Sequence, residues 1–202
     1  MRLEQPYGAV VPPRETSRRY ATGFHSTAGA VYLSDKQAVF FTDFRYVEAA
    51  HAAVKDFEVR EIKAGQSYSA LNNELLDEDG AKKVALEDKT LTYAEFMSWG
   101  TALHATAVRL EDGVEQLRMC KEEDEVEKIV AAQRIAEQAL EEVLNDIKVG
   151  VTEKEIAARL TYLMLHYGAE NMSFDPIVVS GANSSNEHGV DRITGLEAGT
   201  RI

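Results

Sequence analysis

The stretch AGAVYLSDKQAVFFT, residues 28–42, decides how the first half of this chain folds. Two runs rich in β-branched and aromatic residues, Ala28–Leu33 and Ala38–Thr42, flank the polar linker Ser34–Gln37. Runs of this kind separated by a four-residue loop predict an antiparallel β-hairpin. A sheet that contains this hairpin therefore has at least one antiparallel pair of strands.

The sequence beyond this hairpin alternates between helical and extended patterns as far as residue 115. Helices are expected from Asp43 to Val54, from Ser67 or Ser69 to Gly80 and from Thr92, and strands over residues 57–62, 83–86 and 107–110. The third helix begins with a capping box formed by Thr92 and Glu95. Residues 1–20 are polar, contain three prolines and are expected to be irregular. This alternation predicts an α/β domain with a mixed sheet over residues 1–115.

A long amphipathic helix dominates the start of the second region, residues 116–202. Apolar residues recur at the helical period over residues 121–147, and a second helix follows from the capping box Thr152–Glu155. The short apolar run 177–179 predicts a strand, which leads into a polar loop. Thr200 begins a further extended run that is too short to form a ladder. We therefore expect this region to be the front part of a longer domain.

The composition argues against several classes of function. The formal net charge is −12, whereas binding to nucleic acid or to anionic lipid requires a basic surface. No apolar run reaches the length of a membrane span. The single cysteine, Cys120, excludes an internal disulfide and fits a reducing compartment. We expect a cytoplasmic protein that has neither nucleic acid nor a membrane as its partner.

The sequence contains no self-sufficient catalytic or metal-binding motif. It lacks H-E-x-x-H, C-x-x-C, a Walker loop and a G-x-S-x-G elbow. Cys120 stands beside the acidic run Glu122–Asp124, which opposes formation of a nucleophilic thiolate. Asp43 is interpreted as a helix cap that pairs with Arg45. The histidines interpreted as surface or core residues are His25, His51, His104 and His166.

His188 has a setting that differs from that of the other histidines. It lies near the end of SFDPIVVSGANSSNEHGV, residues 173–190, where an apolar run leads into a polar loop. The adjacent Gly189 permits close approach of a ligand. A neutral imidazole can donate a hydrogen bond to a carbonyl oxygen or carry a proton near pH 7. The residues alone leave open whether His188 is functional or simply a loop histidine.

Six segments, in order along nearly the whole chain, resemble one protein family. They are YATGF (20–24), STAG (26–29), FTDFRY (41–46), RMCKEEDEV (118–126), IKVGVTEKEI (147–156) and the stretch from SFD through NSS to HG (173–189). The first three resemble the amino-terminal domain of the proline-specific aminopeptidases and creatinases. The last three are similar to the linker and first helix, the turn between the first two helices, and the substrate-side loop of the catalytic "pita-bread" domain.

The resemblance implies a fold and an activity. Residues 1–115 would form a creatinase-type, ribonuclease-H-like domain with a mixed sheet. Residues 116–202 would form the incomplete first part of an α+β pita-bread domain. The full protein would be a cytoplasmic Xaa-Pro aminopeptidase or dipeptidase and a homo-oligomer, such as a homodimer. Its substrates would be short peptides with proline at the second position.

The resemblance also implies the site. Two divalent ions, manganese or cobalt, would bridge a hydroxide that attacks the carbonyl before proline. His188 would contact that carbonyl or the developing oxyanion, and Phe174 would line the substrate pocket. The family's five metal ligands would all lie after Ile202. We therefore expect no metal ligand in this chain and no peptide hydrolysis by the 202-residue polypeptide alone.

Two alternatives share this fold. A creatine amidinohydrolase type works without metals and uses the histidine of the matching loop as its acid and base, so His188 does not separate it from the peptidase. A non-catalytic, pita-bread-like module would bind other proteins, and its sign would be a large exposed apolar patch. Acidic residues at the ligand positions after Ile202 would favour the peptidase.

Overall fold

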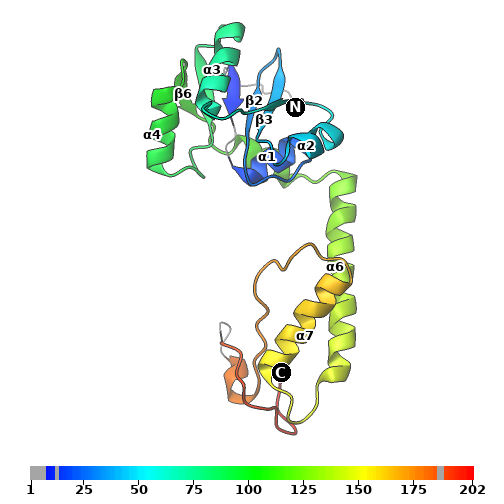
Figure 1. Cartoon of the computed structure of the whole chain (residues 1–202). Helices are drawn as coiled ribbons and strands as arrows, with labels where there is room; N and C mark the ends of the chain where they lie inside the picture. Colours follow the sequence, from blue (N-terminus) through cyan, green and yellow to red (C-terminus); the bar gives the residue numbers. More distant parts are fainter. Residues whose placement is uncertain (1–7, 12–13, 186–188) are drawn as a thin grey trace. The chain divides into compact units, whose positions relative to one another are not determined.

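The computed structural model describes residues 8–11, 14–185 and 189–202. The chain divides into two compact units, unit 1 (Met1–Cys120) and unit 2 (Lys121–Ile202) (Figure 1). The sequence places the boundary earlier, at residue 115. The structure places it after helix α5 (Gly113–Met119), because Val114 on this helix is buried together with Ala85 and Leu110.

Unit 1 is an α/β domain built on a six-stranded sheet. Its strands are β1 (Ala9–Val11), β2 (Ala30–Leu33), β3 (Ala38–Thr42), β4 (Glu58–Glu61), β5 (Lys83–Leu86) and β6 (Thr106–Arg109). The order across the sheet is β4-β3-β2-β1-β5-β6. The strands β1, β2 and β3 pair antiparallel, and the remaining pairs are parallel. The predicted α/β fold with a mixed sheet is therefore confirmed.

The start of unit 1 differs from the irregular segment expected over residues 1–20. Strand β1 lies in the middle of the sheet, between β2 and β5, and helix α1 (Glu15–Thr22) follows it. The ladder partners of β1 are Leu33 and residues 84–86, which are distant in the sequence. A three-residue strand that depends on such distant partners leaves no periodic pattern of its own.

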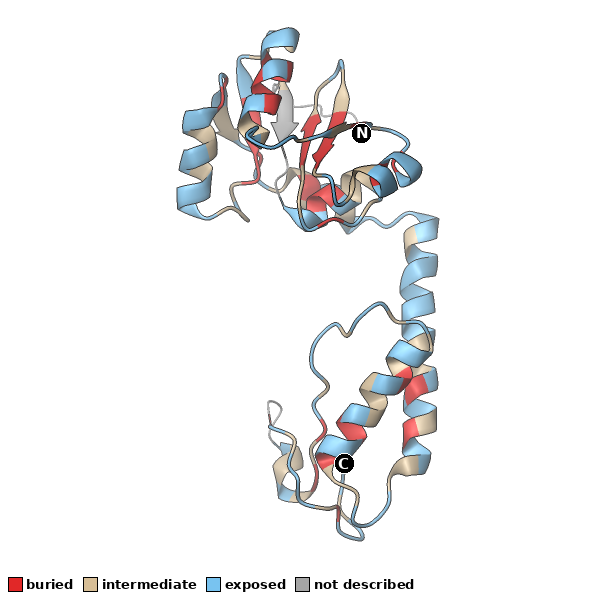
Figure 2. Cartoon of the chain, viewed as in Figure 1, coloured by how far each residue is buried: buried red, intermediate tan, exposed pale blue. Residues whose placement is uncertain are grey.

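The two faces of the sheet pack against different helices. On one face, Tyr32 and Phe41 pack with Leu75 of α3 (Tyr68–Asp79), and α4 (Tyr93–Ala102) also covers this face. On the other face, Val31 and Phe40 pack with Ala50 of α2 (Val47–Ala53). Neighbouring residues of β2 and β3 thus point to opposite faces, as the alternation of a strand requires. Both faces are buried (Figure 2).

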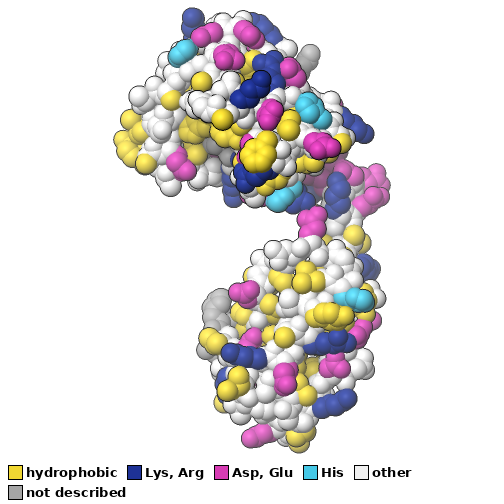
Figure 3. All heavy atoms as spheres, in the orientation of Figure 1, with side chains coloured by type: hydrophobic (Ala, Val, Ile, Leu, Met, Phe, Trp, Pro, Cys, Tyr) yellow, Lys and Arg dark blue, Asp and Glu magenta, His cyan; other side chains and the backbone are white. Residues whose placement is uncertain are grey.

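Unit 2 is organised around two packed helices. They are α6 (Glu123–Val143), which continues into the 3₁₀ turn η1 (Leu144–Asp146), and α7 (Glu153–His166). Ala139 and Val143 of α6 are buried with Ile156 and Leu163 of α7. Acidic side chains gather at the start of α6 (Figure 3), where Glu123 and its neighbours face the positive end of the helix dipole.

The capping boxes predicted from the sequence are present. Thr92 and Glu95 form the box at the start of α4, and Thr152 and Glu155 form the box at the start of α7. In each box the threonine side chain accepts from the backbone N–H of the glutamate, and the glutamate side chain accepts from the backbone N–H of the threonine. In the α7 box, the Thr152 N–H donates to Glu155 Oε2 over 2.8 Å, and the Glu155 N–H donates to Thr152 Oγ1 over 3.2 Å. The backbone N–H of Glu155, in the first turn of α7, thus has the Thr152 side chain as its acceptor.

The expected strands over residues 177–179 and from Thr200 are not formed. The Val178 N–H bonds to the side chain of Asp191 instead of to a neighbouring strand. Gly181 begins the 3₁₀ turn η2 (Gly181–Ser185), and its N–H donates to the carbonyl of Arg201. Among the described residues, no helix combines the length and the apolar character needed to cross a lipid bilayer.

Candidate functional site

The candidate site lies in the loop of unit 2 that follows α7. Two hydrogen bonds hold the ends of residues 178–192 together. The Val178 N–H donates to Asp191 Oδ1 over 2.8 Å, and Arg192 Nη2 donates to the carbonyl oxygen of Ser180 over 2.8 Å. The two ends of residues 178–192 are therefore held together by hydrogen bonds, so the segment is a loop with adjacent ends.

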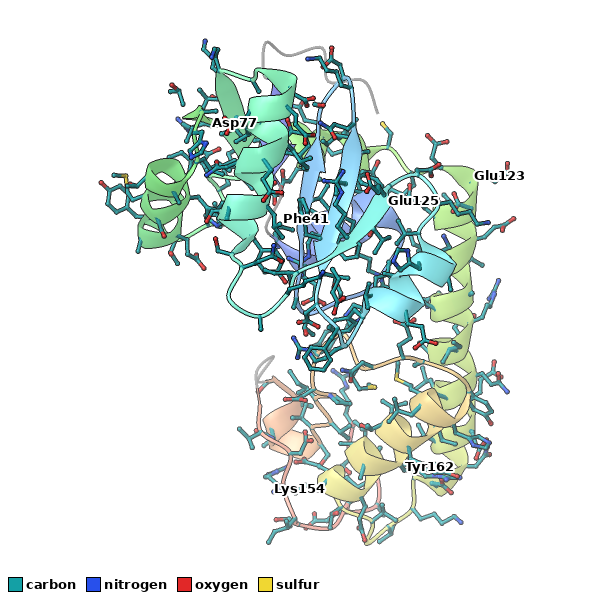
Figure 4. All side chains as sticks on the ribbon, turned by 45° about the horizontal axis from the view of Figure 1, so that its top comes forward. Phe41, Asp77, Glu123, Glu125, Lys154 and Tyr162 are labelled. Atoms are coloured by element: carbon teal, nitrogen blue, oxygen red, sulfur yellow. The ribbon has the colours of Figure 1, made fainter. Side chains whose placement is uncertain are left out.

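Glu153, in the first turn of α7, joins both ends of this loop. Its side chain is fully buried. Oε1 accepts hydrogen bonds from the N–H and from the hydroxyl of Ser180, each over 2.7 Å. Oε2 accepts from the Arg192 N–H over 2.7 Å, and Arg192 Nη2 donates to Oε1 over 2.8 Å. We call Glu153, Ser180, Asp191 and Arg192 the loop clamp; it lies at the end of α7 that Lys154 marks in Figure 4.

The loop clamp keeps Glu153 ionised. The Arg192 guanidinium lowers the pKa of Glu153 to about 2, with further help from the Ser180 hydroxyl and the two backbone N–H groups, and this outweighs the effect of burial. A carboxylate with this pKa is a poor proton acceptor near neutral pH. Glu153 is thus a negative charge that holds its hydrogen-bond donors, Ser180 and Arg192, in place.

The described residues do not fit a two-metal centre. Among them, no group of three His, Cys, Asp or Glu side chains lies close enough to hold an ion. The oxygens of Glu153 already accept from Ser180 and Arg192. The buried Glu87 belongs to unit 1, where its carboxylate accepts from the hydroxyl of Ser17.

The sequence assigns two residues to the site, His188 and Phe174, and the structure describes only Phe174. His188 lies outside the described residues, although the clamped loop includes it in the sequence. Phe174 precedes the loop in a stretch without regular secondary structure, and 74 % of its surface is exposed. Its place in a substrate pocket stays a prediction.

The residues interpreted as structural lie on the surface. Nε2 of His25 is 2.7 Å from Glu15 Oε1, Nδ1 of His104 is 2.9 Å from Asp77 Oδ2, and His166 stacks on the ring of Tyr162. The expectation that Asp43 caps a helix is wrong. Helix α2 begins later, at Val47, and the expected pairing of Asp43 with Arg45 is confirmed in the turn before it.

Sequence reasoning missed the loop clamp. Glu153 stands inside the pattern Thr152-Glu-Lys-Glu155, where an acid at a helix start needs no further explanation. The sequence around Ser180 and Arg192 does not indicate that they bind a carboxylate, since their partner, Glu153, is distant in the sequence. A polar serine directly after the apolar run 177–179 was the available hint.

An open depression of about 510 Å³ lies in unit 1, between α4 and β6. Its lining is mixed: Phe96, Met97 and Leu103 are apolar, Thr101 and Thr106 are polar, and His104 adds one titratable side chain. The ring of His104 is already engaged with Asp77. Nothing in this lining forms an acid–base pair.

Two family models match the chain in succession. Residues 4–120 match the creatinase/prolidase N-terminal domain, and residues 127–201 match metallopeptidase family M24. Together with the mixed sheet, these matches define a creatinase-type α/β domain followed by part of a pita-bread domain. The chain belongs to the family of proteins that carry a creatinase/prolidase N-terminal domain, and its residues 127–201 are similar to metallopeptidase family M24. The resemblance identified from the sequence is thereby confirmed.

Relatives and solved structures agree with this assignment. An uncharacterized peptidase of Bacillus subtilis, YqhT, is 36 % identical over 93 % of this chain and 53 % of its own length. An Xaa-Pro dipeptidase from Bacillus anthracis (TM-score 0.86, 37 % identity) aligns with 96 % of this chain and 54 % of its own. An X-Pro aminopeptidase from Thermotoga maritima (TM-score 0.88, 34 % identity) aligns with 96 % of this chain over 56 % of its own length. The chain thus spans about half the length of these relatives.

Proposed function

We propose that this chain supplies the N-terminal domain and part of the catalytic domain of a metal-dependent Xaa-Pro peptidase. The enzyme removes the residue that precedes proline at the N-terminus of short peptides. The observation that carries the proposal is the alignment of 96 % of this chain with two solved proteins named for Xaa-Pro cleavage, at 37 % and 34 % identity.

In this proposal, His188 donates a hydrogen bond to the substrate carbonyl or to the oxyanion formed from it, and Phe174 lines the pocket. The similarity of residues 127–201 to metallopeptidase family M24 supports a requirement for divalent metal, for which manganese and cobalt are the candidates. Such ions, when bound, activate a hydroxide for attack on the carbonyl. In this proposal the metal ligands come from outside the described residues, and the 202-residue chain alone does not hydrolyse peptides.

The exposed apolar surface of α6 fits both a peptidase domain that is completed by further structure and the protein-binding module considered above, so it does not separate the two. Val126, Ile129 and Val130 form part of one apolar face, and each is about half exposed. An apolar helix face of this kind is suited to packing against further secondary structure. In the proposed enzyme, other parts of the pita-bread domain cover this face.

A chimera tests the proposal. Residues 1–202 of this chain are joined to the segment of the Bacillus anthracis dipeptidase that lies beyond the aligned region. Hydrolysis of alanyl-proline is measured with manganese, with cobalt and with chelator, and alanyl-alanine serves as the control substrate. We expect metal-dependent hydrolysis with a preference for alanyl-proline.

Other outcomes separate the alternatives. The 202-residue chain, assayed in parallel, is expected to be inactive, and metal-dependent release of alanine by it would contradict that part of the proposal. Hydrolysis of creatine without metal would favour the amidinohydrolase. A folded chimera that acts on neither substrate would overturn the enzymatic assignment and favour a binding module.

The assembly and the cellular compartment are also part of the proposal. We infer a homo-oligomer, with a homodimer as the simplest form, and a cytoplasmic location. The exposed thiol of Cys120 supports a reducing compartment. Light scattering during gel filtration of the chimera tests the oligomer, and a monomeric mass at micromolar concentration would contradict it.

A further inference from the structure

The two edges of the sheet in unit 1 differ in charge. One edge strand, β4, carries Glu58, Arg60 and Glu61, and Arg60 is paired with Glu58. Charged side chains of this kind protect an edge against pairing with another chain. The other edge strand, β6, reads Thr-Ala-Val-Arg, and Arg109 is its one charged residue. Among the described residues, no further strand pairs with the outer side of β6, so this edge is open to another strand.

The outward-facing backbone groups of β6 belong to every second residue. The N–H groups of Thr106 and Leu110 donate to carbonyl oxygens of the β5 segment over 3.0 and 2.8 Å. Because the backbone groups of a strand alternate in direction, those of Ala107 and Arg109 point away from β5. The N–H and C=O of Ala107 are therefore a donor and an acceptor with which a further strand can pair.

Helix α4 adds an apolar surface beside this edge. No side chain of α4 is fully buried, and Tyr93 and Met97 are 81 % and 47 % exposed. Phe96, Met97 and Ala107 line the open depression between α4 and β6, and hydrophobic side chains gather over α4 in Figure 3. The helix lies close to the strand, since a Cβ on Gly100 would be 3.4 Å from that of Ala107. A strand added to β6 would therefore lie beside this apolar helix surface.

The charged side chains at the two ends of β6 differ in net sign. At its start, two lysines outnumber one acid: Lys82, Lys83 and Asp77. At its end, two acids outnumber one arginine, beside an ion pair that is neutral: Asp88, Glu111 and Arg109, with Lys89 paired to Asp112. Antiparallel pairing with a second copy brings the start of one β6 to the end of the other. Opposite net charges then meet at both ends, which favours a second copy of this chain as the partner.

We infer that β6 and α4 form the contact between two copies of this chain, with the two β6 strands paired antiparallel about Ala107. This inference rests on the part of the proposed function that describes a homodimer, and it names the surface. The same patch serves both copies, as a two-fold axis requires. Ala107 lies opposite Ala107 of the second copy, and its small side chain lets the two α4 helices approach. Phe96 and Met97 of both copies then cover the paired strands.

The first experiment measures the mass of the 202-residue chain by sedimentation between about 1 and 100 μM, where we expect a reversible dimer with a low-micromolar Kd. Ala107→Pro removes an outward N–H and spares the ladder with β5, and Met97→Lys places a charge in the apolar contact. Each is expected to raise the Kd by at least about 10-fold. The control is Glu61→Pro, which leaves the Kd unchanged. It removes an outward N–H from β4, where the next N–H, that of Ile62, faces β3.

The second experiment tests whether the occupant is a second copy in this register. Glu111→Lys makes both ends of β6 positive and is expected to raise the Kd about threefold at low salt. Adding Lys82→Glu reverses the sign at the other end and is expected to restore the Kd, because the two-fold axis repeats both changes.

A disulfide tests the centre of the register. Ala107→Cys, made together with Cys120→Ser, is expected to give a covalent dimer on oxidation, because opposed residues of a hydrogen-bonded pair have Cα atoms about 5.5 Å apart. Glu61→Cys in the same background is the matched control on the other edge and stays unlinked.

The outcomes separate this inference from the proposed function. A 202-residue chain that stays monomeric over the whole concentration range would overturn the inference, even if the chimera is a dimer. A dimer that tolerates both Ala107→Pro and Met97→Lys would overturn it too, because that dimer uses another surface. Failure of Lys82→Glu to restore the Kd would contradict the antiparallel register. A chimera without peptidase activity would overturn the proposed function, and the mass of the 202-residue chain would then decide this inference alone.

Discussion

Unit 1 buries Glu87 and unit 2 buries Glu153, and the pKa values of these two carboxyl groups are shifted in opposite directions. Their exposed fractions are 2 % and 0 %. Burial raises the pKa of Glu87, whereas the Arg192 guanidinium lowers the pKa of Glu153 to about 2. Desolvation is the largest influence on the pKa of Glu87, whereas the hydrogen bonds from the Arg192 side chain are the largest influence on the pKa of Glu153.

The donors differ in number and in charge. Glu87 accepts from the hydroxyl of Ser17 and, over a long 3.4 Å, from the backbone N–H of Arg14. The guanidinium of Arg14 is directed to Glu115, 3.7 Å away. The close side-chain donor to Glu87 is thus a neutral hydroxyl, whereas Glu153 also accepts from a charged guanidinium.

The largest expected effect is on stability. We expect Glu153→Ala to lower the free energy of unfolding of unit 2 by about 3 kcal/mol, because it leaves Ser180 and Arg192 without their shared acceptor. Glu87→Gln is expected to change unit 1 by less than about 1 kcal/mol, since a neutral amide can still accept from Ser17.

Urea unfolding measures both changes. The single tryptophan, Trp99, lies in unit 1 and reports its unfolding by fluorescence, while amide exchange of α7 reports unit 2. Equal losses for the two substitutions would show that the contrast between the carboxylates has no energetic basis.

The second effect is the pH dependence of unit 2. The pKa of Glu153 is depressed from its ordinary value of 4.5 to about 2, so the folded state binds fewer protons than the unfolded state between these values. The stabilisation is fully present above pH 4.5 and is lost as the pH falls toward 2. The stability gap between wild type and Glu153→Gln should therefore shrink over this interval, as followed by amide exchange of α7.

Glu87 is expected to give a smaller effect of opposite sign. Its folded pKa lies above 4.5, so the folded state binds the proton more tightly. Its contribution is most favourable below pH 4.5 and is lost as the pH rises through the raised pKa. Relative to Glu87→Gln, wild-type unit 1 should be more stable at pH 4 than at pH 7 in Trp99-monitored unfolding. A gap that widens toward neutral pH would contradict the raised pKa.

The distance along the sequence between interacting residues explains what the sequence could predict. The hairpin over residues 28–42 and both capping boxes depend on neighbours in the sequence and were predicted. Strand β1 and the loop clamp depend on partners that are far apart in the chain and were missed. Local periodicity carries no information about such partners.

The candidate site was predictable only in part for this reason. The polar loop and His188 could be singled out from residue type and position. The buried carboxylate that holds the loop could not, because an acid in the first turn of a helix has an ordinary explanation as a partner of the dipole. Its burial and its pairing with Arg192 depend on how the chain returns after the loop.

The last predicted effect is a difference between two serines of the same loop. The Ser180 hydroxyl donates to the ionised Glu153 over 2.7 Å, and the Ser184 hydroxyl donates to the neutral carbonyl of Gly181 over the same distance. A hydrogen bond to a charged group contributes more, so Ser180→Ala should cost unit 2 about 2 kcal/mol and Ser184→Ala about 1 kcal/mol. Amide exchange of α7 at pH 7 measures both. Equal costs at pH 7 would mean that the charge on Glu153 adds nothing to the clamp, whereas a difference that disappears near pH 2 would trace the extra stability to the ionised carboxylate.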